Sequence, residues 1–146
     1  MRELPRQLSA EELAGLFEGR TALVERLAQV EHPLERADAA IAELGEDEKI
    51  EALNAHPAIG ARSGLSARSA REQGEQADPA VLAELAYANH VYEEKFGFRF
   101  VVFVNRRPKS ALVPILRERL ERTREHELDT ALDELVAIAL DRWRRR

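Results

Sequence analysis

The 146-residue sequence contains no cysteine, which excludes disulfide bonds, thiolate nucleophiles and cysteine-ligated zinc sites. Aromatic residues make up only 5%, and alanine, leucine, glutamate and arginine dominate, which favours helices over sheets. A net charge of −5 argues against a broad nucleic-acid surface. No apolar run approaches the roughly 20 residues of a membrane span, and no signal-peptide core is present. Composition therefore predicts a cytoplasmic protein that binds neither nucleic acid nor membrane.

The chain does have enough apolar sequence for a core. Hydrophobic residues make up 45% and charged residues 34%, a balance typical of globular proteins. The length fits one domain, residues 1–146, more simply than two. No repeat, low-complexity stretch or linker divides it.

Apolar residues recur with helical spacing along most of the chain. Capping signals support several starts: Ser9 with Glu12 forms a capping box, and Asp78 precedes a proline at the first helical position. Asp47 can cap another helix, and Gly19 can close the first one. We expect helices at about 9–19, 21–30, 34–44, 47–56, 66–73, 78–96, 110–120 and 127–143.

The run FRFVVFV, residues 98–104, is the one β-like stretch. It is too short and solitary to make a sheet, so we expect an extended or single-turn segment that crosses the core. Ser110 opens the next helix, which places Pro114 in or near its first turn, where proline is least harmful. The predicted fold is all-α, a single-domain bundle of about seven to eight helices with one short extended segment near 98–104.

Residues 55–73, AHPAIGARSGLSARSAREQ, carry the most chemistry. Ser69, Glu72 and Gln73 are spaced i, i+3 and i+4, which places three hydrogen-bonding side chains on one helical face. His56 is close enough in sequence to share that face. Taken alone, His56 is more often an ordinary loop histidine than a catalyst.

Three polar residues fall on apolar helix faces. Arg142 continues the stripe of the last helix, and an arginine there must snorkel, pair with an acid or serve a ligand, because a buried unpaired charge is costly. Snorkelling carries about half of the weight at a helix end. Arg119 is a similar but weaker case. Asn89 is interpreted as a structural asparagine bonded to a neighbouring loop, in preference to a ligand contact.

Several classes of site lack their motifs. The four histidines, His32, His56, His90 and His126, show no spacing of a metal site. No P-loop, dinucleotide-binding or GxSxG motif is present, and no lysine stands in a context that suggests a Schiff base. The sequence therefore predicts neither a metal nor a cofactor.

The combination of these motifs resembles the OHCU decarboxylase family, named after its substrate 2-oxo-4-hydroxy-4-carboxy-5-ureidoimidazoline, an intermediate of urate breakdown. The resemblance covers about residues 25–143. The sequence lacks the early tryptophan of the family, which Leu34 replaces, and its loop between His56 and Glu72 is shorter than in eukaryotic members. The matching positions are His56, Pro57 and Gly60; Ser69, Glu72 and Gln73; Asn89, Tyr92, Lys95, Phe96 and Gly97; Phe100, Val101 and Val102; and Arg142 with Trp143.

The resemblance implies a cofactor-independent decarboxylase that forms (S)-allantoin, acts on a small molecule and assembles as a homodimer. It also implies roles for site residues. His56 would be the catalytic acid or base, as its ordinary pKa near 6.5 allows. Glu72 would accept hydrogen bonds from substrate N–H groups. The other implied substrate-binding residues are Pro57, Ser69, Gln73, Phe100, Val101, Val102 and Arg142.

Two alternatives stay open at this point. One is a helical interaction module on the same scaffold without catalysis. The other is a lyase or isomerase that acts without cofactor on a related ureido or imidazole acid. Turnover of the intermediate would distinguish the decarboxylase from the interaction module. A comparison of substrates would distinguish it from the related lyase or isomerase.

Overall fold

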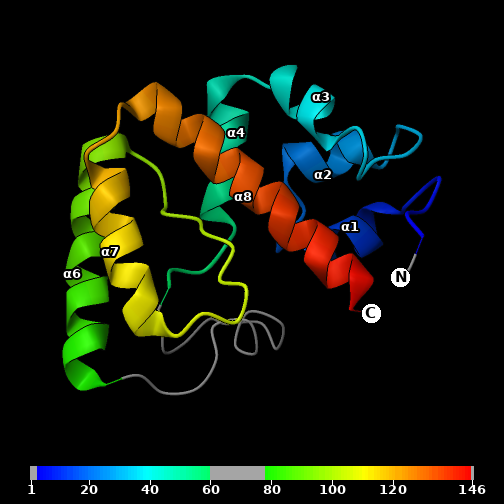
Figure 1. The fold of residues 1–146 in the computed structure, drawn as a ribbon. Helices are drawn as coiled ribbons and strands as arrows, with labels where there is room; N and C mark the ends of the chain where they lie inside the picture. The colour runs from blue at the N-terminus through cyan, green and yellow to red at the C-terminus, as the bar shows by residue number, and fades with distance from the viewer. Residues whose placement is uncertain (1–2, 60–77, 146) are drawn as a thin grey trace. The chain divides into compact units, whose positions relative to one another are not determined.

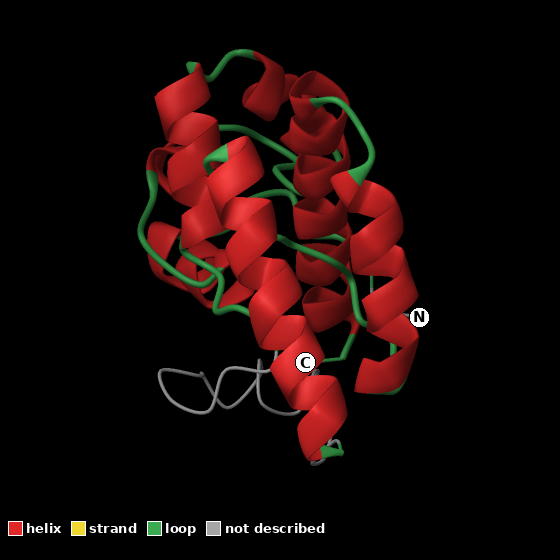
Figure 2. Cartoon of the chain, turned by 90° about the vertical axis from the view of Figure 1, so that its left-hand side faces the viewer, coloured by secondary structure: helices red, strands yellow, loops and turns green. Residues whose placement is uncertain are grey.

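A computed structural model describes residues 3–59 and 78–145, and all regular structure in these ranges is helical (Figures 1 and 2). The predicted all-α fold class is confirmed. The chain divides into two compact units, and His56 and Pro57 lie on opposite sides of one boundary. The first unit consists of Met1–His56 with Leu132–Arg146, and the second of Pro57–Ala131.

Four short helices and the end of the last helix build the first unit. They are α1 (Ala10–Phe17), α2 (Ala22–Leu27), α3 (Ala37–Ala42), α4 (Glu46–Asn54) and the C-terminal part of α8 (Arg124–Arg144). Helix α2 packs against α1, α3 and α4. Its Leu23, Val24 and Leu27 are fully buried, so this six-residue helix is held by tertiary packing more than by its own length.

The helix ends of the first unit agree only partly with the predicted caps. Ser9 and Glu12 form the expected capping box, with both side-chain to backbone distances at 3.1 Å. Glu18, and not Gly19, takes the left-handed conformation that ends α1, with φ at 66°. Gly45 precedes α4, and its N–H donates to the Glu48 carboxylate at 3.0 Å. The prediction of Asp47 as the cap is therefore wrong.

Helices α2 and α3 are both shorter than the apolar spacing predicted. Residues 28–36 between them form turns. His32 has a φ of 53°, and its N–H donates to the Arg6 carbonyl at 2.7 Å. Pro33 follows directly and disfavours helical geometry at the residue before it, which explains why the pattern does not continue.

The second unit contains the helix pair α6 (Pro79–Phe96) and α7 (Lys109–Leu120), which lie side by side (Figure 1). Helix α6 has the predicted ends. Asp78 Oδ1 accepts from the Ala80 N–H at 2.8 Å, proline occupies the first turn, and Gly97 ends the helix with φ at 82°. Because that φ is left-handed, glycine is the residue that adopts it at least cost.

Helices α7 and α8 begin earlier than predicted. Pro108, and not Ser110, is the residue before α7, so Pro114 is the sixth helical residue and lies beyond the first turn. Thr123 precedes α8, and its hydroxyl accepts from the His126 N–H at 3.2 Å. This cap starts the helix at Arg124 and places Glu127 in its first turn, where a carboxylate is favoured.

Residues 98–104 form neither helix nor strand, and five of them are buried: Phe98, Phe100, Val101, Val102 and Val104. The aromatic rings of this segment pack on Tyr92 of α6. Their centroids lie 5.9 Å from it for Phe98 and 5.2 Å for Phe100, both edge-on. The segment is thus part of the core of the second unit, as its composition predicts.

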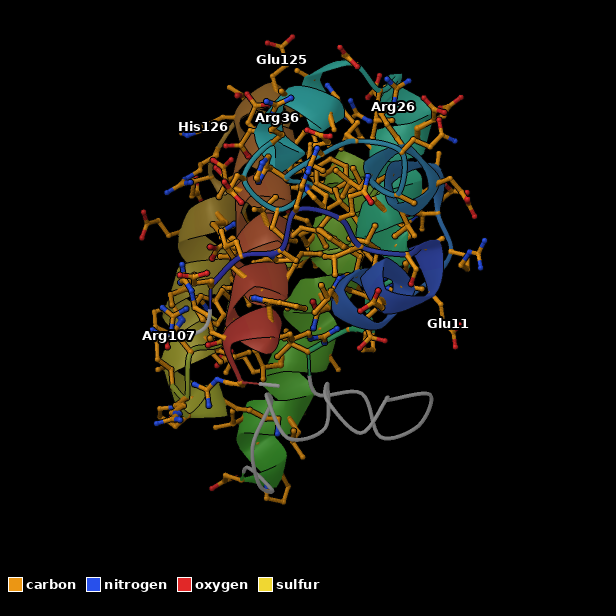
Figure 3. All side chains as sticks on the ribbon, turned by 90° about the vertical axis from the view of Figure 1, so that its right-hand side faces the viewer. Glu11, Arg26, Arg36, Arg107, Glu125 and His126 are labelled. Carbon is orange, nitrogen blue, oxygen red and sulfur yellow. The ribbon has the colours of Figure 1, made fainter. Side chains whose placement is uncertain are left out.

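Polar side chains such as those of Glu11, Glu125 and His126 point outward (Figure 3). None of the described helices is long and apolar enough to cross a membrane.

Replacement of Pro114 by alanine is expected to stabilise the protein. Pro114 is exposed and lies in the interior of α7, where it removes one helical hydrogen bond. We expect the free energy of unfolding to rise by roughly 1–3 kcal/mol, measured by chemical denaturation. An unchanged or lower value would show that the neighbouring backbone already compensates for the proline.

Candidate active site residues

His56 ends the first unit, directly after α4. The helix ends at Asn54, and the His56 N–H donates to the Leu53 carbonyl at 3.2 Å, which closes a final turn. The His56 side chain belongs to a residue that is only 5% exposed. A buried imidazole next to a proline is held in place more firmly than a loop histidine in solvent, which suits a residue that transfers a proton at a defined position.

The segment after His56 is held by Asn89, both within the second unit. Asn89 is 6% exposed, and its Nδ2 donates to the Ile59 carbonyl at 3.1 Å. The predicted hydrogen bond of Asn89 to a neighbouring loop is therefore confirmed. Pro57 is half-buried in this same segment. The predicted site residues Ser69, Glu72 and Gln73, together with Gly60, lie outside the described residues.

Arg142 is buried in the first unit, so the snorkelling interpretation is wrong. Its residue is 4% exposed. Nη1 donates to the carbonyls of Leu16 at 3.2 Å and Gly15 at 3.4 Å, and Nη2 pairs with Glu18 at 2.9 Å. Arg142 thus binds the end of α1, where helix carbonyls lack partners and a cation is favoured. The role of Arg142 toward substrate stays a prediction.

A buried polar network occupies the second unit. Oε1 of Glu127 accepts from the Tyr92 hydroxyl at 2.6 Å and from Nε of Arg119 at 2.7 Å. Nη1 of Arg119 also donates to the Val101 carbonyl at 2.8 Å. Tyr92 and Glu127 are both 0% exposed, and Arg119 is 3% exposed. A charged pair this deep depends on its hydrogen bonds, and here Nε and Nη1 of Arg119 and Oε1 of Glu127 are all bonded, while Nη2 of Arg119 and Oε2 of Glu127 have no hydrogen-bond partner among the described residues.

The network links an element of the predicted site to three helices. Val101 lies between Phe100 and Val102, the predicted substrate-binding run, and all three residues are 1–3% exposed. The guanidinium of Arg119 also lies over the Phe100 ring, 4.6 Å from its centroid. Arg119 therefore fixes both the backbone and one ring of this run.

Sequence reasoning noted Arg119 but missed its partners. A signal for Glu127 exists in the spacing of α8. Glu127 lies four residues before Ala131 and eight before Leu135, so it continues the apolar stripe toward the helix start as Arg142 continues it toward the end. An acidic residue on an apolar helix face, like an arginine there, must reach solvent, form an ion pair or bind a ligand, and Glu127 forms an ion pair.

In residues 3–59 and 78–145, no three histidine, aspartate or glutamate side chains are grouped closely enough to hold a metal ion.

Comparison with known proteins identifies the family of this chain. The sequence profile described as OHCU decarboxylase matches residues 2–144, nearly the whole chain. The chain belongs to the OHCU decarboxylase family. The resemblance that the motifs predicted is thereby confirmed.

Two archaeal relatives carry the name 2-oxo-4-hydroxy-4-carboxy-5-ureidoimidazoline decarboxylase. The one from Halalkalicoccus jeotgali is 28% identical over 103 residues, which are 68% of this chain and 58% of that protein. The one from Haloferax volcanii is 30% identical over 105 residues, 68% of this chain and 62% of that protein. The chain thus spans about three fifths of the length of these curated relatives.

Two solved structures share the OHCU decarboxylase fold. A crystal structure of OHCU decarboxylase in the presence of (S)-allantoin matches with a TM-score of 0.75 at 23% identity, over 90% of this chain and 94% of that one. A crystal structure of (S)-allantoin synthase matches with a TM-score of 0.68 at 24% identity, over 91% of this chain and 47% of that one. At these identities the likeness concerns the fold.

The buried Tyr92 hydroxyl predicts a pH-dependent stability. Burial, together with the hydrogen bond to Glu127, raises the pKa of Tyr92 far above its ordinary value. Above pH ~10 the unfolded chain loses this proton while the folded chain keeps it. The free energy of unfolding is therefore unaffected by this ionisation below pH ~10 and falls as the pH rises above that value. The contribution of Tyr92 to this fall is at most about 1.4 kcal/mol per pH unit.

Chemical denaturation between pH ~9 and ~11 measures this slope. We expect a smaller slope for Tyr92→Phe and the wild-type slope for Tyr87→Phe, since Tyr87 is 71% exposed. Equal slopes for all three proteins would show that the Tyr92 hydroxyl ionises as readily folded as unfolded.

Proposed function

We propose that this protein decarboxylates 2-oxo-4-hydroxy-4-carboxy-5-ureidoimidazoline to (S)-allantoin in urate catabolism, without a cofactor. The single observation that carries the proposal is the family match over residues 2–144. The names of the two archaeal relatives point to the same reaction. Since the chain spans about three fifths of those relatives, its own activity is the point to be measured.

The chemistry explains why positioned side chains are sufficient. The substrate carboxylate is attached to a ring carbon next to a carbon–nitrogen double bond. When the bond to the carboxylate breaks and CO2 leaves, its electron pair passes into that double bond. A proton then adds to one face of the ring, which fixes the enantiomer. The work of the protein is to orient the substrate, stabilise the developing charge and deliver the proton.

The proposed roles follow the family motif. His56 acts as the acid or base that moves the proton, supported by its burial at a turn between α4 and Pro57. Glu72 accepts hydrogen bonds from ureido or ring N–H groups, and Ser69 and Gln73 complete that polar side.

The remaining proposed residues bind rather than transfer protons. The run from Phe100 to Val102 supplies an apolar wall and backbone hydrogen bonds. Pro57 lines the binding region. Arg142 holds a carbonyl or carboxylate oxygen of the substrate, in addition to the bonds that it makes to the end of α1. We also propose that residues 1–146 act as one domain and that the protein is cytoplasmic.

Replacement of His56 by alanine is expected to abolish the acceleration of intermediate decay. Well-placed proton transfer contributes roughly 10²–10⁴ in rate, so the loss should be of that order. The intermediate is generated freshly from urate by uricase and hydroxyisourate hydrolase, and circular dichroism follows the appearance of optically active allantoin. Far-UV circular dichroism verifies that the helices persist.

A second histidine provides the matched control for this experiment. The His90 side chain is 68% exposed and pairs with Glu94 on the surface of α6, so His90→Ala should keep wild-type turnover. Unchanged turnover in His56→Ala would remove His56 from the mechanism. A wild-type protein that alters neither the decay rate nor the chirality of the product would instead favour a helical interaction module, and turnover of another ureido or imidazole acid would favour a related lyase.

We further propose a homodimer, as the family resemblance implies. Tyr87 on α6 is the one large hydrophobic side chain that is exposed within the described ranges, and it offers a handle for a test. Light scattering after size exclusion should give twice the chain mass of 16.5 kDa. Tyr87→Glu should shift the mass toward one chain if α6 forms the contact, with His90→Ala as the control. A wild-type mass of one chain would overturn the dimer.

A further inference from the structure

Arginine side chains donate hydrogen bonds to three carbonyl groups of residues 98–104, those of Val101, Phe103 and Val104. Nη1 of Arg119 donates to the Val101 carbonyl at 2.8 Å. Arg107 donates through Nε to the Val104 carbonyl at 3.0 Å and through Nη2 to the Phe103 carbonyl at 2.6 Å. Of these two arginines, only Arg119 acts inside the predicted substrate-binding run.

The backbone N–H groups of the run from Phe100 to Val102 differ from its carbonyl groups in their hydrogen bonding. Within residues 3–59 and 78–145, no acceptor takes a hydrogen bond from the N–H groups of Phe100, Val101 or Val102. These three residues are only 1–3% exposed. Buried backbone N–H groups almost always have an acceptor. A bound substrate oxygen is the acceptor that the proposed function supplies.

The geometry of the peptide bond connects the carbonyl to one of these amides. The described chain has no cis peptide bond, so the Val101 carbonyl and the Val102 N–H belong to one trans peptide group and point in opposite directions. Whatever fixes the carbonyl oxygen also fixes the direction of the N–H. A cationic donor on the oxygen also polarises the group and strengthens its N–H as a donor.

Arg119 itself has little freedom to move. Its Nε donates to Glu127 Oε1 at 2.7 Å, and the same oxygen receives the Tyr92 hydroxyl at 2.6 Å. Its guanidinium lies over the Phe100 ring, with 4.6 Å from carbon to centroid. Two separate nitrogens of the planar guanidinium donate here, Nε to the carboxylate and Nη1 to the carbonyl. Lysine carries all of its N–H groups on one nitrogen, so it cannot reproduce that spacing.

We propose that Arg119 is a positioning residue for the reaction: it holds the Val101–Val102 peptide so that the Val102 N–H donates to a substrate oxygen on which charge develops. Glu127 and Tyr92 keep Arg119 in the required orientation. This inference rests on the proposed decarboxylation. A donor that gains strength as charge develops stabilises the transition state more than the bound substrate, so it acts on kcat more than on KM.

The first test is Arg119→Lys, which keeps a positive charge but cannot span Glu127 and the Val101 carbonyl. Removal of one such donor costs on the order of 10²–10³ in kcat. Because Arg119→Lys misorients the Val102 N–H without removing it, we expect a smaller fall in kcat, about tenfold to a hundredfold, with KM changed by less than about threefold. Arg117→Lys is the matched control on the same helix, because Arg117 is 64% exposed at its side chain and pairs with Glu84 on the surface.

A spectroscopic readout separates positioning from a purely structural role. In ¹⁵N-labelled protein, (S)-allantoin should move the Val102 amide proton downfield in the wild type and in Arg117→Lys, and much less in Arg119→Lys. Should Arg119→Lys fail to fold, Tyr92→Phe and a backbone ester in place of the Val102 amide provide the test. The ester removes the N–H itself and should lower kcat at least as strongly as Arg119→Lys is expected to.

The outcomes distinguish this inference from the function on which it rests. A wild-type protein without turnover overturns the proposed function and the positioning role together. Wild-type turnover with an unchanged kcat in a folded Arg119→Lys, or with full activity in the Val102 ester, overturns the positioning role alone. A lower kcat with the (S)-allantoin shift of Val102 retained also overturns it, because the loss would then arise elsewhere.

Discussion

The second unit depends on one carboxylate oxygen. Oε1 of Glu127 receives both the Tyr92 hydroxyl and the Arg119 guanidinium in a region without solvent exposure. This joins α6, α7 and α8 through a single acceptor, and Arg119 extends the connection to the segment 98–104. Loss of one partner from such a buried pair costs about 3–5 kcal/mol, because the other charge is left without compensation. Substitution of a single member of the network is therefore expected to destabilise the second unit strongly.

Local signals were sufficient wherever the deciding interaction lies within a few residues. Both ends of α6 follow from Asp78, Pro79 and Gly97, and the start of α1 follows from Ser9 and Glu12. The run 98–104 was recognisable as a buried segment without a sheet, because nothing else in the chain could pair with it. Asn89 was correctly interpreted because a polar residue on an apolar stripe must bond to something nearby.

Interactions across long sequence separations could not be deduced in the same way. Tyr92 and Glu127 are 35 residues apart, and Arg142 donates to the Leu16 carbonyl across 126 residues. No local sequence pattern predicts either hydrogen bond. Arg142 also shows why periodicity alone is ambiguous. A charge on an apolar face is compatible with solvent, an ion pair or a ligand, and only the position of α1 within the first unit selects the ion pair.

The unusual backbone of residues 98–104 also bears on misfolding. Short uncharged runs rich in valine and phenylalanine are prone to assemble into cross-β aggregates once they are accessible. Here the only charged member is Arg99. Burial of the segment, together with the hydrogen bonds from Arg119 and Arg107 to its carbonyl groups, keeps this backbone away from other copies. Partial opening of the second unit would release this segment before the chain is fully unfolded. Solubility under heat stress should therefore depend on the integrity of that unit.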